Sequence, residues 1–210
     1  MGSASKAKAA RKAEALANPH AKLSTAIEVI GWVYGSYADC AAVSAFLKVT
    51  AAKLGYELTP RSVSLIANQP SKKNHAHMGP KATALIPESE QHRVEDYKPD
   101  GRDTGHMVLV SEDLMLMIDP NIGQLRGYGM AAPNSLAVAI ESTEPASGEW
   151  LASAPDLRLV YMPDDNPALW PHYEASLIDA EENAAKLAMF INRGFSAARI
   201  KTMLKQHPGH

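Results

Sequence analysis

The 210-residue sequence has a single cysteine, Cys40, and no long apolar run. One cysteine cannot form an intramolecular disulfide, which is typical of proteins in a reducing compartment. No apolar stretch approaches the roughly 18 residues that a membrane-spanning helix needs, and the first 20 residues lack the apolar segment of a secretory signal. These absences predict a soluble, cytoplasmic protein without a membrane partner.

The sequence also lacks a surplus of basic charge outside its N-terminus. The net charge is −2, and residues 1–22 hold five Lys or Arg and one acidic residue, which leaves 16 basic and 22 acidic residues in the rest of the chain. Binding to a phosphate backbone depends on clustered Lys and Arg. We therefore do not expect nucleic acid as a partner, and we interpret residues 1–22 as a basic helical or flexible extension.

Enough apolar sequence is present, at 46% of residues, to form the core of one domain. Apolar residues recur at helical spacing in some segments and alternate in others, and the intervening residues 69–105 are polar and predict a long loop. Helices are expected at 21–34, 40–54, 172–192 and from 196, and strands at 61–68, at 135–142, at 157–163 and, as a hairpin, at 106–119. Along the chain, helices come first, the strands of an antiparallel sheet follow and helices come last. This order predicts an α+β fold.

The hairpin segment "GHMVLVSEDLMLMIDP" carries one polar pair at its open end. A two-residue turn at Glu112 and Asp113 would place His106 directly opposite Asp119. Directly opposed residues have Cβ atoms about 4.5 to 5.5 Å apart, so the Asp119 carboxylate could accept a hydrogen bond from the His106 imidazole. A histidine oriented by a carboxylate is half of a nucleophilic site.

Cys40 is the candidate for the other half. Asp39 is a suitable N-cap, which places Cys40 in the first turn of the predicted helix, and Gly55 suits the position after its C-terminus. The unpaired N–H groups and the dipole at a helix N-terminus favour a thiolate over a thiol. The sequence thus predicts a Cys40, His106 and Asp119 triad, with the Cys40 backbone N–H as the first candidate oxyanion donor and Tyr37 or Gln69 as side-chain candidates.

The segments "ADCAAVSAFLKVTAAKLGY", "GHMVLV" and "LMIDP" resemble the transglutaminase-like branch of the papain-like superfamily, and are similar to bacterial transglutaminase-like cysteine peptidases. The resemblance covers residues 35–122. It implies a papain-like (transglutaminase-like) core in which the nucleophile-bearing helix packs on an antiparallel β-sheet, with N- and C-terminal helical extensions. The implied domains are an extension at 1–22, a catalytic domain at 23–165 and a C-terminal helical segment at 166–210.

The same resemblance implies an activity. Cys40 would be the nucleophile, His106 the general base and then acid, and Asp119 the residue that orients it. The expected enzyme is a hydrolase, a cysteine (thiol) protease or amidase that cleaves an amide bond of a peptide or protein substrate through a thioester. A transglutaminase-type acyltransferase with the same triad is the alternative, and no metal ion or organic cofactor is implied.

Two further interpretations remain open. The histidines of "HAH" at 75–77, with His92 and His106, could form a metal site, although their segment lacks cysteine or an acidic cluster. The C-terminal helices at 172–192 and from 196 resemble a helix–turn–helix in outline. Their acidic residues favour instead a helix docked on the sheet, or a non-catalytic binding module for a protein partner or homodimer.

Overall fold

The computed structural model describes residues 20–87, 105–164 and 166–206. The described helices are α2 (Ala21–Tyr34), α3 (Cys40–Lys53), α4 (Pro80–Thr83), α5 (Trp170–Asn192) and α6 (Ala197–Gln206), with short 3₁₀ helices η1 (Pro70–Lys72), η3 (Ile122–Tyr128) and η4 (Pro167–Leu169). The described strands are β1 (Thr59–Gln69), β2 (Asn74–Met78), β3 (His106–Ser111), β4 (Leu116–Asp119), β5 (Leu136–Ala139), β6 (Trp150–Ala154) and β7 (Leu157–Pro163). Helix and sheet are both well represented, as the sequence predicted.

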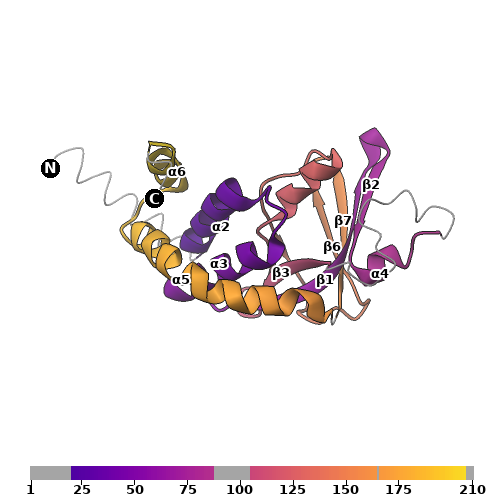
Figure 1. The fold of residues 1–210 in the computed structure, drawn as a ribbon, viewed down its shortest axis with the longest axis horizontal. Coiled ribbons are helices and arrows are strands. Elements are labelled where there is room, and N and C mark those ends of the chain that lie inside the picture. The colour runs from indigo at the N-terminus through magenta and orange to yellow at the C-terminus, as the bar shows by residue number, and fades with distance from the viewer. Residues whose placement is uncertain (1–19, 88–104, 165, 207–210) are drawn as a thin grey trace.

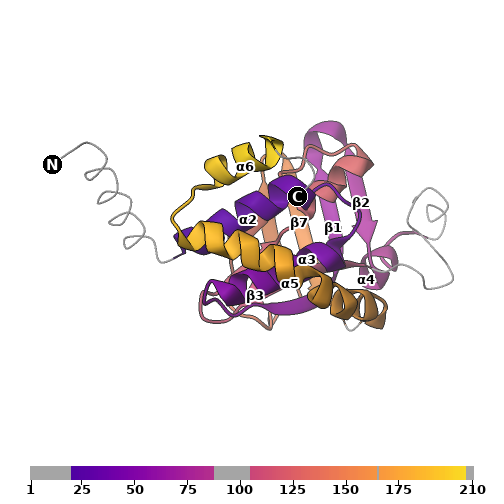
Figure 2. The same ribbon diagram turned by 60° about the vertical axis from the view of Figure 1, so that its left-hand side comes forward.

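The described strands form one antiparallel sheet in the order β5-β4-β3-β1-β7-β6, with β2 paired to β1. β1 is long enough to pair with β3 along its first half and with β2 along its second half, while β7 pairs along its other edge. Helices α2, α3 and α5 gather on one side of the sheet, and α6 lies beside α2 (Figures 1 and 2).

Two buried clusters fill the space on the two faces of the sheet. Along β3 every residue is buried, and neighbouring side chains point to opposite faces. Leu109 packs with the helices, whereas Val108 and Val110 pack with residues of the other strands, including Tyr161 of β7. β3 is therefore a central strand covered on both faces, and its first residue is His106.

The predicted loop at 69–105 is wrong for its described part, residues 69–87. This part contains the end of β1, a tight turn with Lys73 at φ 50°, β2 and α4. β2 has the sequence "NHAHM", which lacks a clear apolar alternation. The strand forms because its backbone pairs with β1, and only Ala76 and Met78 in it are buried. Residues 88–104 of the predicted loop lie outside the described residues, as do residues 1–19 of the predicted extension.

The C-terminal helices form as predicted, and Gly194 has a positive φ of 80° between them. The expectation that the long helix docks on the sheet needs correction. α5 packs mainly along α3, with further contacts to α2, and only its first turns join a cluster that includes Met107 of β3. Helices α3 and α5 therefore both reach the start of β3, which begins with His106.

Candidate active site

Cys40 is the first residue of α3, where the chain leaves an extended conformation. Asp39 adopts φ −143° and ψ 70°, and its Oδ1 accepts from the Ala42 N–H at 3.0 Å, which is the N-cap that the sequence predicted. His172 of α5 donates from Nε2 to the same carboxylate at 2.9 Å. In the described part of the chain the Cys40 backbone N–H has no acceptor, as expected for the first turn of a helix. The thiol therefore lies at the positive end of the helix dipole.

The first turns of α3 are fixed against the start of β3. Ser44 Oγ donates to the Met107 carbonyl at 3.2 Å, and Cys40, Ala41 and Ala45 pack with the Met107 side chain. Leu169 and Tyr173, which precede and begin α5, complete this cluster and leave Cys40 only 7% exposed. The contact brings Cys40 next to the residue before Met107, which is His106.

His106 and Asp119 form a buried pair. The ring Nε2 lies 2.8 Å from Asp119 Oδ2, and both side chains are 0% exposed. Because an ionised carboxylate only accepts hydrogen bonds, Nε2 must carry the proton. The carboxylate also accepts from the Tyr161 hydroxyl and from the Asn121 N–H, each at 2.9 Å. Asp119 therefore holds His106 in one tautomer and one orientation.

The predicted hairpin register is wrong by two residues, although the predicted pair meets. Ser111 is opposite Leu116 and Leu109 is opposite Ile118, so Asp119 is displaced along the strand from the position facing His106. Residues with this offset still share one face of the sheet and are diagonal neighbours, about 7 to 8 Å apart at Cα, which long side chains span. The turn has four residues, and Met115 within it has φ 48°.

The charge state of His106 follows from its three neighbours. Burial by itself lowers the pKa of His106, but the charge of Asp119 and hydrogen bonds to Asp119 and Cys40 raise that pKa by more, to about 10. Since Asp119 occupies Nε2, Nδ1 is the ring nitrogen through which His106 could take the thiol proton. An imidazole that favours its protonated form beside a thiol stabilises a thiolate and imidazolium pair.

Gln124 is a site residue that sequence reasoning missed. It lies on η3, and its side-chain Nε2 is 2.6 Å from His106 Nδ1. The segment "IDPNIGQLRGYG" holds no pattern that distinguishes this glutamine, because its place depends on how η3 folds back over the strand end. The structure thus adds an amide beside the ring nitrogen that Asp119 leaves free.

Asn121 ties the two halves of the site together. Its Nδ2 donates to the carbonyl of Tyr34 at 2.9 Å and to that of Tyr37 at 3.0 Å, so it holds the segment that leads into Cys40. The same residue donates its N–H to Asp119. One buried asparagine therefore fixes the distance between the segment carrying the thiol and the segment carrying the carboxylate.

The backbone of η3 packs closely against the segment that leads into Cys40. A Cβ added to Gly123 would lie 2.6 Å from the Gly35 carbonyl oxygen, closer than real Cβ contacts allow. Beside it, Arg126 Nη1 donates to Ser36 Oγ at 2.7 Å. Glycine at 123 therefore lets η3 approach the segment before Cys40.

Of the two side-chain oxyanion candidates from the sequence, Gln69 lies far from His106, whereas Tyr37 lies three residues before Cys40 and stays a prediction. Gln69 lies six residues along β1 from Val63, the partner of His106, which is about 20 Å in a strand. Its amide donates to Asp156 at 2.9 Å and accepts from the Ala131 N–H at 3.2 Å. Tyr37 is 59% exposed beside Tyr34. The backbone N–H of Cys40 remains the candidate that the geometry supports.

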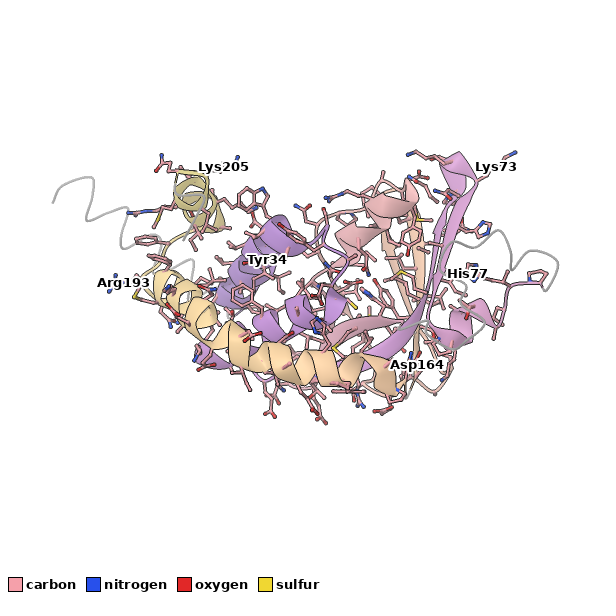
Figure 3. The ribbon with its side chains drawn as sticks, viewed as in Figure 1. Tyr34, Lys73, His77, Asp164, Arg193 and Lys205 are labelled. Carbon is pink, nitrogen blue, oxygen red and sulfur yellow. The ribbon has the colours of Figure 1, made fainter. Side chains whose placement is uncertain are left out.

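The histidines considered for a metal site do not come together with His106. His75 and His77 lie on β2 with ring centroids 5.5 Å apart, and His77 stands at the β2 end of the molecule, away from Tyr34 on α2 (Figure 3). His106 is held by Asp119, and His92 lies outside the described residues. Within the described ranges no three metal-binding side chains form a cluster.

Comparison of the chain with protein-family models, with curated proteins and with solved structures finds no match. No helix in the described part of the chain is both long enough and apolar enough to cross a membrane. The function must therefore be argued from the site itself.

Proposed function

We propose that this protein is a thiol-dependent hydrolase that cleaves an amide bond with Cys40 as nucleophile, His106 as general base and acid, and Asp119 as the orienting residue. The observation that carries the proposal is the buried relay: Asp119 Oδ2 lies 2.8 Å from His106 Nε2, and the same imidazole hydrogen-bonds to Cys40, the first residue of a helix. A packing cysteine requires neither a charged partner nor a fixed tautomer.

The proposed steps follow from this geometry. Nδ1 takes the thiol proton, and Sγ attacks the carbonyl carbon of the substrate. The resulting oxyanion accepts from the backbone N–H of Cys40, and collapse releases the amine, which takes the proton from Nδ1. Water then attacks the thioester carbonyl with His106 again as base, the C–S bond breaks to release the carboxylic acid, and the proton returns from His106 to Cys40 Sγ. In a transglutaminase-type reaction, an amine would replace that water.

The order of elements supports a papain-like core as part of the same proposal. The nucleophile begins a helix that packs on an antiparallel sheet, and the histidine and aspartate lie on neighbouring strands of that sheet. This arrangement supports the papain-like core that the resemblance implies for residues 35–122. The proposed substrate is a peptide or protein, and the proposed compartment is the cytoplasm, where a lone thiol stays reduced.

The rate of Cys40 alkylation by iodoacetamide, measured against pH, tests the proposal. Because the proposal pairs Cys40 with a protonated His106, the wild-type thiol should react quickly at pH 6 to 7, where an ordinary thiol is almost entirely protonated. His106→Ala and His106→Gln should abolish this fast phase, and Cys40→Ser should remove the labelled product seen by mass spectrometry. Circular dichroism establishes that each variant is folded.

A wild-type thiol that reacts no faster than a free cysteine would contradict the proposal. The proposal would also be contradicted if the His106 variants were folded and Cys40 in them still reacted quickly with iodoacetamide. Either outcome would return Cys40 to a packing role and favour the non-catalytic binding module, in which α5 and α6 contact a protein partner or a second copy of the chain.

A further inference from the structure

A cavity of about 560 Å³ lies beside the segment that carries Cys40. It is bounded by the end of α2, the first turns of α3 and the N-terminal part of α5, three helices that pack together (Figure 2). Asp39 lines the cavity and directly precedes Cys40, so their Cα atoms are about 3.8 Å apart. The cavity is therefore close enough to the thiol to receive a side chain of a bound substrate.

Three aromatic rings form a continuous part of the cavity wall. The Tyr34 ring lies 5.8 Å from the ring of Tyr37 and 5.6 Å from the ring of Phe46, measured between centroids. The face of an aromatic ring is electron-rich and attracts a cation within about 6 Å of its centroid. This wall therefore suits a side chain that combines an apolar stem with a positive charge.

The charged groups on the cavity wall are two carboxylates and one imidazole. The carboxylate of Asp39 is already engaged, because it caps α3 and accepts from His172 at 2.9 Å. Asp179 of α5 forms no ion pair with any group in the described ranges. Among the described residues the lining includes no lysine or arginine. The uncompensated charge of the cavity is therefore negative, and it belongs to Asp179.

We propose that this cavity is a specificity pocket for a lysine or arginine side chain on the substrate residue whose carbonyl Cys40 attacks. This inference rests on the proposed function and names its substrate class, peptides with a basic residue at the cleaved bond. The ammonium or guanidinium group lies against the faces of Tyr34 and Phe46 and pairs with Asp179. An exposed carboxylate by itself binds a cation weakly, so the selectivity requires the aromatic wall as well.

Two p-nitrophenyl esters test this assignment. One is the ester of Nα-acetyl-lysine, and the other is the ester of Nα-acetyl-2-aminoheptanoic acid, in which a methyl group replaces the ammonium. In both reactions the Cys40 thiolate forms a bond to the acyl carbon, the C–O bond breaks and p-nitrophenolate leaves. Thioester formation is measured on the full chain by intact mass under single-turnover conditions, in about 0.15 M salt to screen long-range attraction. Alkylation by iodoacetamide measures the reactivity of the thiol without the pocket.

We expect the wild-type protein to form the lysine thioester about tenfold faster than the neutral one. Asp179→Asn and Phe46→Leu should each lower this ratio about threefold, because each removes one of the two attractions for the cation. Glu174→Gln is the matched control, since it removes an exposed carboxylate of the same helix outside the cavity and should retain the ratio. Alkylation should stay within about twofold of wild type in all three variants, because the triad is unchanged.

Equal rates for the two esters in wild type, including no reaction with either, or a faster neutral ester would overturn the inference. The proposed function would stand if iodoacetamide still reacted quickly. A preference for the lysine ester that persists in both Asp179→Asn and Phe46→Leu would also overturn the inference, because the cation would then bind elsewhere. The same holds if Glu174→Gln lowers the ratio as much as Asp179→Asn, since net charge alone would then explain it. A wild-type thiol inert to all three reagents would overturn the proposed function itself, and the inference with it.

Discussion

At the scale of single residues, the Asp119 carboxylate organises the site. Oδ2 accepts from His106 and Tyr161, and Oδ1 accepts from the Asn121 N–H, all inside the protein. A buried charge is tolerated when its partners are complete. The three donors keep the carboxylate in place, and its charge in turn holds the pKa of His106 high against the opposing effect of burial.

Replacing this charge should weaken the triad more than removing one of its donors. Asp119→Asn keeps a side chain of the same shape but removes the charge that raises the pKa of His106. We expect it to abolish the fast alkylation of Cys40 at pH 6 and to lower turnover by about 10³ to 10⁴-fold, the size of the effect when a triad acid is neutralised.

Tyr161→Phe is the matched control for that variant. It removes one hydrogen bond to Asp119 and should cost about 1 kcal/mol in the free energy of unfolding, measured with urea, while fast alkylation persists. Equal alkylation rates at pH 6 for Asp119→Asn and wild type would show that the carboxylate charge does not control the thiol.

At the scale of elements, helix α3 depends on its cap. The Asp39 carboxylate accepts the Ala42 N–H inside the first turn and also contacts His172 of α5. The first interaction is local, and the second is an ion pair between largely exposed side chains, which contributes little. The cap, rather than the ion pair, should therefore set the stability of the turn that presents Cys40.

Substitution at Asp39 separates the two contributions. Asp39→Ala should lower the free energy of unfolding by about 1 kcal/mol, because it removes the cap. Asp39→Ser keeps a capping oxygen and loses the ion pair, so it should remain close to wild type in urea denaturation. If the serine variant were as unstable as the alanine variant, the contact with His172 would be the more important of the two.

The same local chemistry explains which elements the sequence could predict. The Asp39 cap, the α3 helix and the positive φ of Gly55 follow from neighbouring residues and agree with the structure. The hairpin register does not follow in this way, because its turn places Met115 at φ 48°, a conformation that bulky residues rarely adopt. A standard two-residue turn was therefore the wrong choice.

Tertiary contacts account for the site residues that were missed. Gln124 and Asn121 reach His106 and the segment before Cys40 only because η3 folds back against Gly35. No spacing pattern in the sequence predicts that η3 folds back against Gly35. The acidic and basic groups of the site carried a recognisable order along the chain, whereas the two amides that complete it have common side chains in an irregular segment.

At the scale of the whole molecule, the site lies where the helical layer meets the sheet. The titration of His106 therefore couples to global unfolding. The pKa of His106 in the folded protein is raised to about 10, above the value of about 6.5 in an unfolded chain. The group therefore contributes stability that is fully present below about pH 6.5 and is lost as the pH rises toward 10.

A pair of variants isolates this contribution from that of the thiol. Cys40→Ala leaves His106 beside Asp119, and Cys40→Ala with His106→Gln removes the imidazole as well. We expect the difference between their free energies of unfolding to shrink as the pH rises from about 6.5 to 10, measured in urea at several pH values. A difference that stays constant over this range would show that His106 does not gain protons on folding.

The hydrogen bond from Ser44 to the Met107 carbonyl joins residues 63 positions apart, whereas the β3 and β4 hairpin is local in the chain. Contacts between distant segments form late during folding, because the intervening chain must first be ordered. His106 can therefore meet Asp119 before α3 arrives, and Cys40 behaves as an ordinary thiol until then. On the proposed function, a rise in the reactivity of Cys40 should therefore mark the packing of α3 against β3 during refolding.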